Sequence, residues 1–279
     1  MKIGIVGLGL IGGSIGLKLQ SLNHIIYGIA NNETNARKAK DRKLANFVSC
    51  DLGILRECSI IILALPIKDL INPCYELIEA IPKDSIVTDV GSIKEPIINV
   101  WENKHPLFVG SHPMAGTEKK GVESGFKDLF KNTKWIITPT QKSEPIAIST
   151  LSKLIESMGC EISKASPKEH DEAVSLISHL PIFLATSLIE TASKKNNESL
   201  LNLTHKFAAS GFADTSRVGG GNPQLSLDLA INNQSNILKA LDDFKDKISD
   251  LELLIKNKNW ESLFKKLSKA KEERAKFIN

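Results

Sequence analysis

The stretch Gly7-Leu-Gly-Leu-Ile-Gly12 follows a short run of β-forming residues, Lys2-Ile-Gly-Ile-Val6, and leads directly into a helical pattern over residues 13–20. Taken alone, a G-x-G-x-x-G pattern is weak evidence, because glycines also mark ordinary turns. Its position between a strand and a helix, with a second strand expected from Ile25, is typical of a nucleotide-binding βαβ unit. This context predicts a dinucleotide site.

Each part of this fingerprint has a physical role in holding a pyrophosphate. Gly7 allows the tight turn, Gly9 lets the backbone approach the anion, and Gly12 lets helix and strand pack closely. The start of the helix, at Leu10 and Ile11, offers free N–H groups and a partial positive charge. These five residues are the predicted pyrophosphate site.

The end of the second strand indicates which cofactor binds. An NAD enzyme normally carries Asp or Glu there to hold the ribose 2′-hydroxyl, whereas Ala30 and Asn31 occupy this position here. We expect Glu33 to lie in the first turn of a helix that Asn32 caps. No carboxylate then opposes a 2′-phosphate, and Asn31 and Thr34 can donate hydrogen bonds to it. The sequence favours NADP, with NAD as the alternative.

Short β-rich runs alternate with helical patterns through the first part of the chain, which is typical of a doubly wound α/β fold. Strands are predicted near residues 2–6, 25–29, 59–65, 85–90, 107–110 and 135–138. From about residue 166, helical patterns continue to the C-terminus. We therefore predict a Rossmann-type parallel sheet over residues 1–165 and an all-helical domain for substrate binding and dimerisation over residues 166–279.

The last part of the chain carries a regular apolar seam. Its residues step by four and three positions: Ile237, Leu241, Phe244, Ile248, Leu251 and Ile255. A period of 3.5 residues predicts packing between helices, and it also suits a homodimer interface.

Composition narrows the class of protein. An apolar content of 42% supports a folded core, and the chain lacks a secretory signal or an apolar run near the roughly 20 residues that cross a bilayer, which favours a cytoplasmic protein without membrane attachment. The four cysteines lack C-x-x-C spacing, and no metal site is expected. The net charge of +4 comes from scattered lysines, which favours small anionic ligands over nucleic acid.

One segment of the helical part suggests anion recognition. Arg217 is the only arginine between residues 57 and 273, and its planar guanidinium can grip a carboxylate through two hydrogen bonds. The glycines that follow, including Gly221, lead to Asn222-Pro223, which predicts an N-cap and a first helical residue. A salt bridge to Asp214 is the structural alternative.

Two further residues, His179 and His112, are candidates for chemistry or binding. His170 and His179 are nine positions apart, which on a regular helix turns them to opposite faces. His179 is favoured because Pro181 disturbs the helix beside it, although a lone helical histidine is more often structural. His112 is expected just after the strand that ends near Val109, where ligands of doubly wound sheets bind. There it could accept a proton from an alcohol while the carbon gives a hydride to the cofactor; a hydrogen-bonded loop histidine is the alternative.

Five motifs can be compared with known families. They are GLGLIGGS at 7–14, TDVGSIK at 88–94, GSHPMAGTEKKG at 110–121, ISHLP at 177–181 and GFADTSRVGGGNP at 211–223. Together they resemble the prephenate/arogenate dehydrogenases of tyrosine biosynthesis, and in particular the short cyanobacterial-type arogenate dehydrogenases. The resemblance covers essentially the whole chain.

The resemblance implies roles for individual residues. His112 matches the catalytic histidine, Ser92 its hydrogen-bonding companion, and His179 and Arg217 the substrate-binding residues. The implied reaction is an NAD(P)-dependent oxidative decarboxylation, in which the cyclohexadienyl ring loses a hydride and its carboxylate and becomes a phenol. The alternatives are another two-domain NADP-dependent hydroxyacid dehydrogenase and a non-catalytic NADP sensor.

Overall fold

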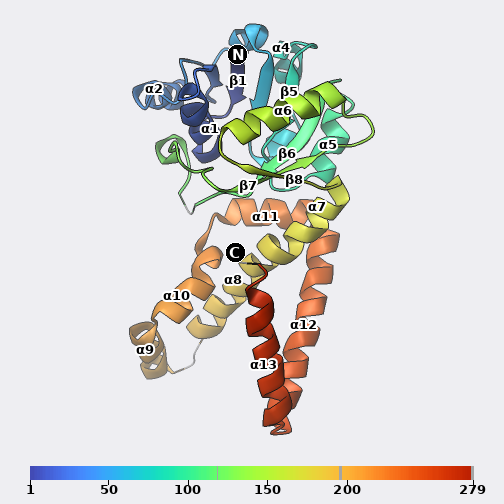
Figure 1. Cartoon of the computed structure of the whole chain (residues 1–279). Coiled ribbons are helices and arrows are strands. Elements are labelled where there is room, and N and C mark those ends of the chain that lie inside the picture. The colour runs from blue at the N-terminus through green and yellow to red at the C-terminus, as the bar shows by residue number, and fades with distance from the viewer. Residues whose placement is uncertain (118, 195–196, 278–279) are drawn as a thin grey trace. The chain divides into compact units, whose positions relative to one another are not determined.

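The computed structural model describes residues 1–117, 119–194 and 197–277. Within them, eight strands form one sheet in the order β3-β2-β1-β4-β5-β6-β7-β8 (Figure 1). The strands are β1 (Lys2–Val6), β2 (Ile25–Ile29), β3 (Phe47–Ser49), β4 (Ile60–Leu63), β5 (Ile86–Asp89), β6 (Phe108–Pro113), β7 (Lys134–Thr138) and β8 (Glu161–Lys164).

All six predicted strands are confirmed, and two strands were missed. The missed strands, β3 and β8, are only three and four residues long and lie at the two edges of the sheet. The sheet is mostly parallel, as expected for the fold class, and β6 and β7 are the one pair of neighbouring strands described that runs antiparallel, with His112 opposite Ile136. Strand β6 pairs with two strands along different parts of its length: Phe108 and Val109 pair with β5, and the following residues pair with β7.

Helices cover the sheet and continue to the C-terminus. In the first part they are α1 (Leu10–Gln20), α2 (Glu33–Asp41), η1 (Leu52–Glu57), α3 (Ile67–Ile71), α4 (Tyr75–Ala80), α5 (Glu95–Trp101), η2 (Val122–Ser124) and α6 (Pro145–Ser157). After β8 they are α7 (Pro167–Val174), η3 (Ser175–His179), α8 (Leu180–Ser193), α9 (Glu198–Phe207), α10 (Ser210–Ser216), η4 (Arg217–Gly220), α11 (Pro223–Asn232), α12 (Gln234–Lys256) and α13 (Trp260–Arg274).

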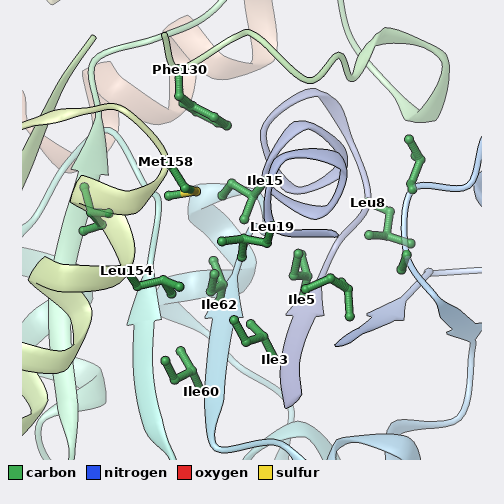
Figure 2. Close-up of a cluster of buried hydrophobic side chains, with 14 of the residues drawn as sticks. Ile3, Ile5, Leu8, Ile15, Leu19, Ile60, Ile62, Phe130, Leu154 and Met158 are labelled. Carbon is green, nitrogen blue, oxygen red and sulfur yellow. The ribbon is translucent and has the colours of Figure 1, made fainter. Parts of the chain in front are cut away.

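The core lies where the central strands meet α1 and α6 (Figure 2). Side chains alternate between the two faces of a strand, so Ile3 and Ile5 of β1 share a face with Ile62 of β4. These residues join one buried cluster with Ile15 of α1 and Leu154 of α6. The continuous apolar sequence of β4 follows from this placement, because a central parallel strand is covered on both faces.

The opposite face holds a second apolar layer. Gly4 of β1 lies there, and a Cβ at this position would come within 2.7 Å of the Ile61 and Leu55 side chains. Trp101 of α5 is fully buried, and its indole N–H donates to the carbonyl oxygen of Leu70 at 2.8 Å. Both faces of the central strands are therefore dry, which fixes the sheet that carries the site.

Helices α7, η3 and α8 form one continuous helical stretch, Pro167–Ser193. By length and hydropathy alone it could cross a membrane, which the sequence analysis did not expect. It also carries the buried polar residues His170, Asp171, Ser175 and His179. Within it, η3 is a π-helical turn, a feature often found at functional sites.

The chain divides into two compact units, residues 1–233 and 234–279. The predicted boundary near residue 165 falls inside the first unit, between β8 and α7. In the second unit, α12 leads into α13, and Asn259 caps α13 by accepting from the Ser262 N–H. Several large apolar side chains of this unit are exposed, among them Phe264 at 71% and Trp260 at 57%.

A buried ion pair joins the end of β5 to the start of α5. The side chains of Lys94 and Asp89 are both completely buried and paired. The carboxylate also accepts N–H groups from Gly91 at 2.8 Å and Ser111 at 3.3 Å, and the ammonium donates to the carbonyl of Ser111 at 2.7 Å. Removal of one partner would leave the other charge buried without compensation.

We expect Lys94→Met to lower the free energy of unfolding by about 3–5 kcal/mol, because it leaves Asp89 as an uncompensated buried charge. Lys142→Met is the matched control, since the Lys142 side chain is 62% exposed and its ion pair with Glu102 is long, at 3.9 Å. This variant should lower the free energy of unfolding by less than about 1 kcal/mol. Urea denaturation at pH 7 measures both. Equal losses in the two variants would show that the buried ion pair contributes no more to stability than the exposed one.

Candidate active site

A glycine-rich turn, residues 7–12, follows β1 at the point where the strand order reverses, between β1 and β4. Gly7 has a φ of +96°, and a Cβ there would lie 2.3 Å from the carbonyl oxygen of Ala64. A Cβ on Gly12 would lie 1.9 Å from the carbonyl oxygen of Gly7, whereas one on Gly9 would meet nothing within 4 Å. Gly7 and Gly12 are thus required by packing, and Gly9 faces open space.

Helix α1 begins directly after Gly9 and has no side-chain cap. The N–H groups of a first helical turn have no partner inside the helix, so those at Leu10 and Ile11 are available to a ligand at the positive end of the helix dipole. An open glycine beside an uncapped helix start fits the pyrophosphate of a dinucleotide. The residues present therefore fit the predicted cofactor.

The end of β2 has the predicted arrangement of helix and cap. Asn32 caps α2 by accepting from the Asn35 N–H at 2.8 Å, and Glu33 lies in the first turn, as expected. Ala30 is buried, so its side chain is not available to a ribose. Asn31 and Thr34 are exposed and offer polar side chains at this edge.

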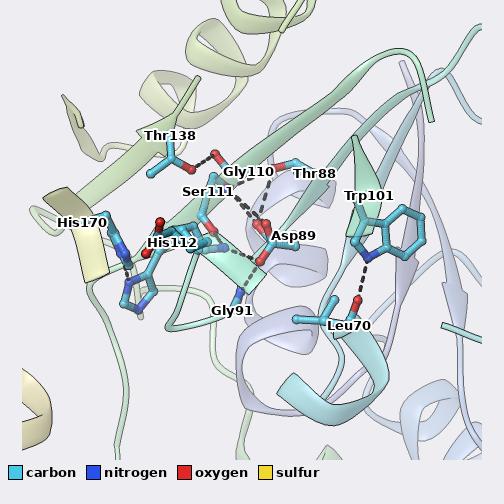
Figure 3. A network of polar contacts seen from close by, with 12 residues as sticks. Leu70, Thr88, Asp89, Gly91, Trp101, Gly110, Ser111, His112, Thr138 and His170 are labelled. Atoms are coloured by element: carbon cyan, nitrogen blue, oxygen red, sulfur yellow. Dashed lines mark hydrogen bonds and ion pairs between the residues drawn. The ribbon is translucent and has the colours of Figure 1, made fainter. Parts of the chain in front are cut away.

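His112 lies within β6, and not after it as the sequence suggested. Its Nδ1 lies 2.9 Å from Nε2 of His170, a residue of α7 (Figure 3). The two rings meet edge to face, with centroids 5.1 Å apart. A strand of the sheet and a helix of the second half of the chain therefore meet at a pair of histidines.

Asp171 contacts the His170 ring of this pair. One of its carboxylate oxygens lies 2.7 Å from Nδ1 of His170 and accepts the Lys94 N–H, also at 2.7 Å. The other oxygen accepts the Glu95 N–H at 2.9 Å. The carboxylate thus binds the first N–H groups of α5 and the imidazole of its own neighbour.

His179 is completely buried, and its Nε2 has no hydrogen-bond partner among the described residues. Its Nδ1 lies 3.2 Å from the amide nitrogen of Asn233, which also donates to the main-chain oxygen of Asp171 at 2.9 Å. Burial lowers the pKa of His179 to about 4, even though Asp171 acts in the opposite direction. The ring is therefore neutral at physiological pH.

The expectation that His170 and His179 point to opposite faces is wrong. The π turn of η3 lies between them, and its one extra residue brings the two side chains to within about 80° of each other around the axis. Sequence reasoning consequently passed over His170. The only signal for it was the adjacent carboxylate in Glu169-His-Asp171.

The surroundings of His112 favour its neutral form. Burial, followed by the nearby His170, Lys94 and His179, holds the pKa of His112 well below its usual range. His179 therefore lies near enough to His112 to disfavour its charged form. A neutral histidine retains a nitrogen that can accept a proton.

The remaining predicted residues lie outside this network. Ser92 is half-buried, and its hydroxyl makes no hydrogen bond to His112 or to any other described residue. Arg217 begins η4 and is exposed, with no ion pair to Asp214 or to other residues that the structure describes. Gly221 is exposed, and the predicted N-cap next to it is confirmed, because Asn222 accepts the Gln224 N–H at 3.1 Å.

Packing explains one of the glycines in this segment. A Cβ on Gly219 would lie 2.8 Å from the backbone of Ala185 and Thr186 in α8. Gly219 therefore lets η4, and Arg217 with it, rest against α8. Across the described chain, no group of three or more His, Cys, Asp or Glu residues could hold a metal ion.

Family models match nearly the whole chain. The prephenate dehydrogenase nucleotide-binding domain matches residues 15–164, and the prephenate dehydrogenase dimerization domain matches residues 166–269. The chain belongs to the prephenate dehydrogenase family. It is therefore a nicotinamide-dependent dehydrogenase, and its helical part is of a kind that forms oligomers.

Individual relatives agree with this assignment. Prephenate dehydrogenase of Bacillus subtilis is 33% identical over 97% of this chain and 74% of its own length. The crystal structure of Synechocystis arogenate dehydrogenase is 36% identical, with a TM-score of 0.85 and full coverage of both chains. Prephenate dehydrogenase from Aquifex aeolicus, in complex with hydroxyphenyl propionate and NAD+, is 29% identical over 99% of this chain and 98% of its own, with a TM-score of 0.92.

Two alanine variants test the glycine turn of this dehydrogenase as the dinucleotide site. Gly9→Ala should leave the thermal stability of the free protein nearly unchanged, because its Cβ meets nothing within 4 Å. It should weaken binding of the nicotinamide dinucleotide at least about tenfold, since the methyl occupies the anion's approach. Gly12→Ala should instead lower the melting temperature. Unchanged affinity in Gly9→Ala would place the dinucleotide elsewhere.

Proposed function

We propose that the chain oxidises a cyclohexadienyl acid of the arogenate or prephenate type, with loss of the ring carboxylate as carbon dioxide and formation of a phenol. The step belongs to tyrosine biosynthesis, which is the function of the relatives named above. The observation that carries the proposal is the pairing of His112 on β6 with His170 of α7, in a site that also holds the buried His179, whose Nε2 has no partner among the described residues. Such a pair suits a ligand that carries a hydroxyl group.

His112 is proposed as the general base. A nicotinamide ring of a dinucleotide bound at the glycine turn would supply the hydride acceptor. His112 takes the proton of the ring hydroxyl as the carbon loses its hydride, and returns it to the phenolate oxygen that forms when the carboxylate leaves as carbon dioxide. The neighbouring His179 contacts the substrate. Ser92 is proposed to lie beside the reacting group, where its unpaired hydroxyl is available.

Arg217 is proposed to bind a substrate carboxylate. Its guanidinium is exposed and makes no ion pair within the described parts of the chain, so both of its N–H edges are available for a bidentate contact. Gly221 and the start of α11 lie next to it in sequence and add the positive end of a second helix. The product would be L-tyrosine from arogenate, or 4-hydroxyphenylpyruvate from prephenate.

NADP is the proposed cofactor, with NAD as an alternative that the Aquifex aeolicus enzyme uses in its complex. Asn31 and Thr34 offer neutral polar groups where NAD-selective proteins carry a carboxylate. We further propose a homodimer formed by the helical part, because its exposed apolar side chains suit an interface. The enzyme is expected to work in the cytoplasm.

His112→Asn should lower turnover of arogenate and prephenate by about 10²–10⁴-fold, the contribution of a general base. Affinity for the dinucleotide should stay nearly unchanged. The exposed residue His205 offers a matched control, and His205→Asn should retain normal turnover. Steady-state kinetics with both substrates measure these effects, and near-normal turnover of His112→Asn would remove His112 from the mechanism.

The pH profile gives an independent test of the same residue. Because the pKa of His112 is lowered, the base is neutral and active at pH 7, and activity should fall only when the pH drops through that lowered value. We therefore expect the acid limb of kcat/KM to have its midpoint below 6.5, the usual histidine value. A midpoint at or above 6.5 would contradict this assignment.

Cofactor preference can be tested at Asn31. Its Oδ1 accepts from Asn35 and Asn32 at 2.7 and 3.2 Å, and a carboxylate can keep both contacts. Asn31→Asp should lower kcat/KM with NADP about tenfold relative to NAD, because like charges near 4 Å cost about 1 kcal/mol even in water and a 2′-phosphate carries two. Asn99→Asp, exposed on α5, controls for net charge. A preference of the unmodified protein for NAD would overturn the NADP proposal.

A further inference from the structure

The tautomer of His112 follows from the chain of contacts behind it. An ionised carboxylate can only accept, so Nδ1 of His170, 2.7 Å from an oxygen of Asp171, carries a proton. A neutral imidazole that donates from one nitrogen accepts at the other. Nε2 of His170 is then an acceptor, and the nitrogen 2.9 Å away, Nδ1 of His112, must donate.

The assignment holds for the neutral form of His170, in which one ring nitrogen donates and the other accepts. The His170 side chain is completely buried, and the Asp171 carboxylate fixes the donating nitrogen as Nδ1. In this form the proton of His112 lies on Nδ1, and the lone pair of its Nε2 is free.

The tautomer of His179 follows from the same residue by a second route. The main-chain oxygen of Asp171 can only accept, so the side-chain atom of Asn233 at 2.9 Å from it is the amide nitrogen. The same nitrogen lies 3.2 Å from Nδ1 of His179 and donates to it. Nδ1 of the neutral ring is then the acceptor, and the proton lies on the partnerless Nε2.

We propose that Asp171, acting through His170 and Asn233, holds the two substrate-facing histidines in opposite tautomers. His112 presents an acceptor at Nε2, and His179 presents a donor at Nε2. The role of these tautomers rests on the proposed function: a hydroxyl that must lose its proton needs an acceptor, and a substrate oxygen needs a donor. His170, Asp171 and Asn233 are positioning residues: they act through the two histidines.

The tautomers can be measured directly in the free protein. Histidine labelled with ¹⁵N reports the protonated nitrogen of each ring by NMR, and single histidine variants assign the signals. At pH 8 we expect Nδ1–H for His112 and Nε2–H for His179. His105 is the internal control: its Nε2 lies 3.0 Å from the carbonyl oxygen of Pro82, and its Nδ1 accepts the Leu107 N–H at 3.3 Å, so it should show Nε2–H throughout.

Variants separate the two routes. His170→Phe removes the acceptor for His112, so the His112 ring should lose its single tautomer and kcat should fall at least about tenfold, though by less than the loss of the base itself. His170→Gln supplies a carbonyl oxygen in its place and should restore Nδ1–H and part of the rate. Asn233→Asp cannot donate, so His179 should change to Nδ1–H, and KM for the substrate should rise.

The outcomes distinguish this proposal from the proposed function. Nε2–H on His112, or a mixture of tautomers in the unmodified protein, would overturn the tautomer assignment even in an active enzyme. An unchanged His179 signal in Asn233→Asp would overturn the second route. Absence of turnover with both arogenate and prephenate, together with the expected NMR signals, would count against the proposed function and leave the tautomer assignment intact.

Discussion

The carboxylate of Asp171 is the contact on which the rest of the site depends. It accepts the N–H groups of Lys94 and Glu95, which places α7 at the start of α5, and it binds the imidazole of His170. Lys94 thus takes part in two buried contacts: its main-chain N–H donates to Asp171, and its side chain pairs with Asp89. The Asp171 side chain therefore helps to connect the helical part of the chain to the carboxyl edge of the sheet, where the chemistry is expected.

Burial makes this arrangement rigid. Hydrogen bonds among desolvated groups are costly to break, because a freed donor or acceptor finds no water to replace its partner. Lys94, Asp89, His170 and Asp171 are all buried, so each has a strong preference for the one geometry that satisfies them all. Rigidity of this kind holds His112 in place without help from the substrate.

Much of the fold could be predicted from the sequence, because its signals are local. The glycine fingerprint, the apolar strand β4 and the caps at Asn32 and Asn222 each depend on a few adjacent residues and were confirmed. Strands β3 and β8 were not predicted, because a short strand at a sheet edge needs few apolar residues and gives almost no periodic signal. The antiparallel pairing of β6 with β7 depends on tertiary contacts.

The candidate site was less predictable for the same reason. His112 and His179 were proposed from their sequence surroundings, whereas His170 and Asn233 entered only when the structure joined residues far apart in the chain. The π turn has no sequence signature comparable to a cap or a glycine turn. On a regular helix His170 would lie on the face opposite His179, whereas the π turn brings it to the same side.

The π turn of η3 also determines which changes in length this part of the chain can accept. A helix that contains one extra residue in such a turn can lose that residue and become a regular α-helix with all backbone hydrogen bonds intact. The two histidines would then be eight positions apart on a regular helix, which keeps their side chains about 80° apart. One additional residue between them would instead add about 100° and turn them to opposite faces. This segment can therefore lose one residue, but not gain one, and still present both histidines on the same side.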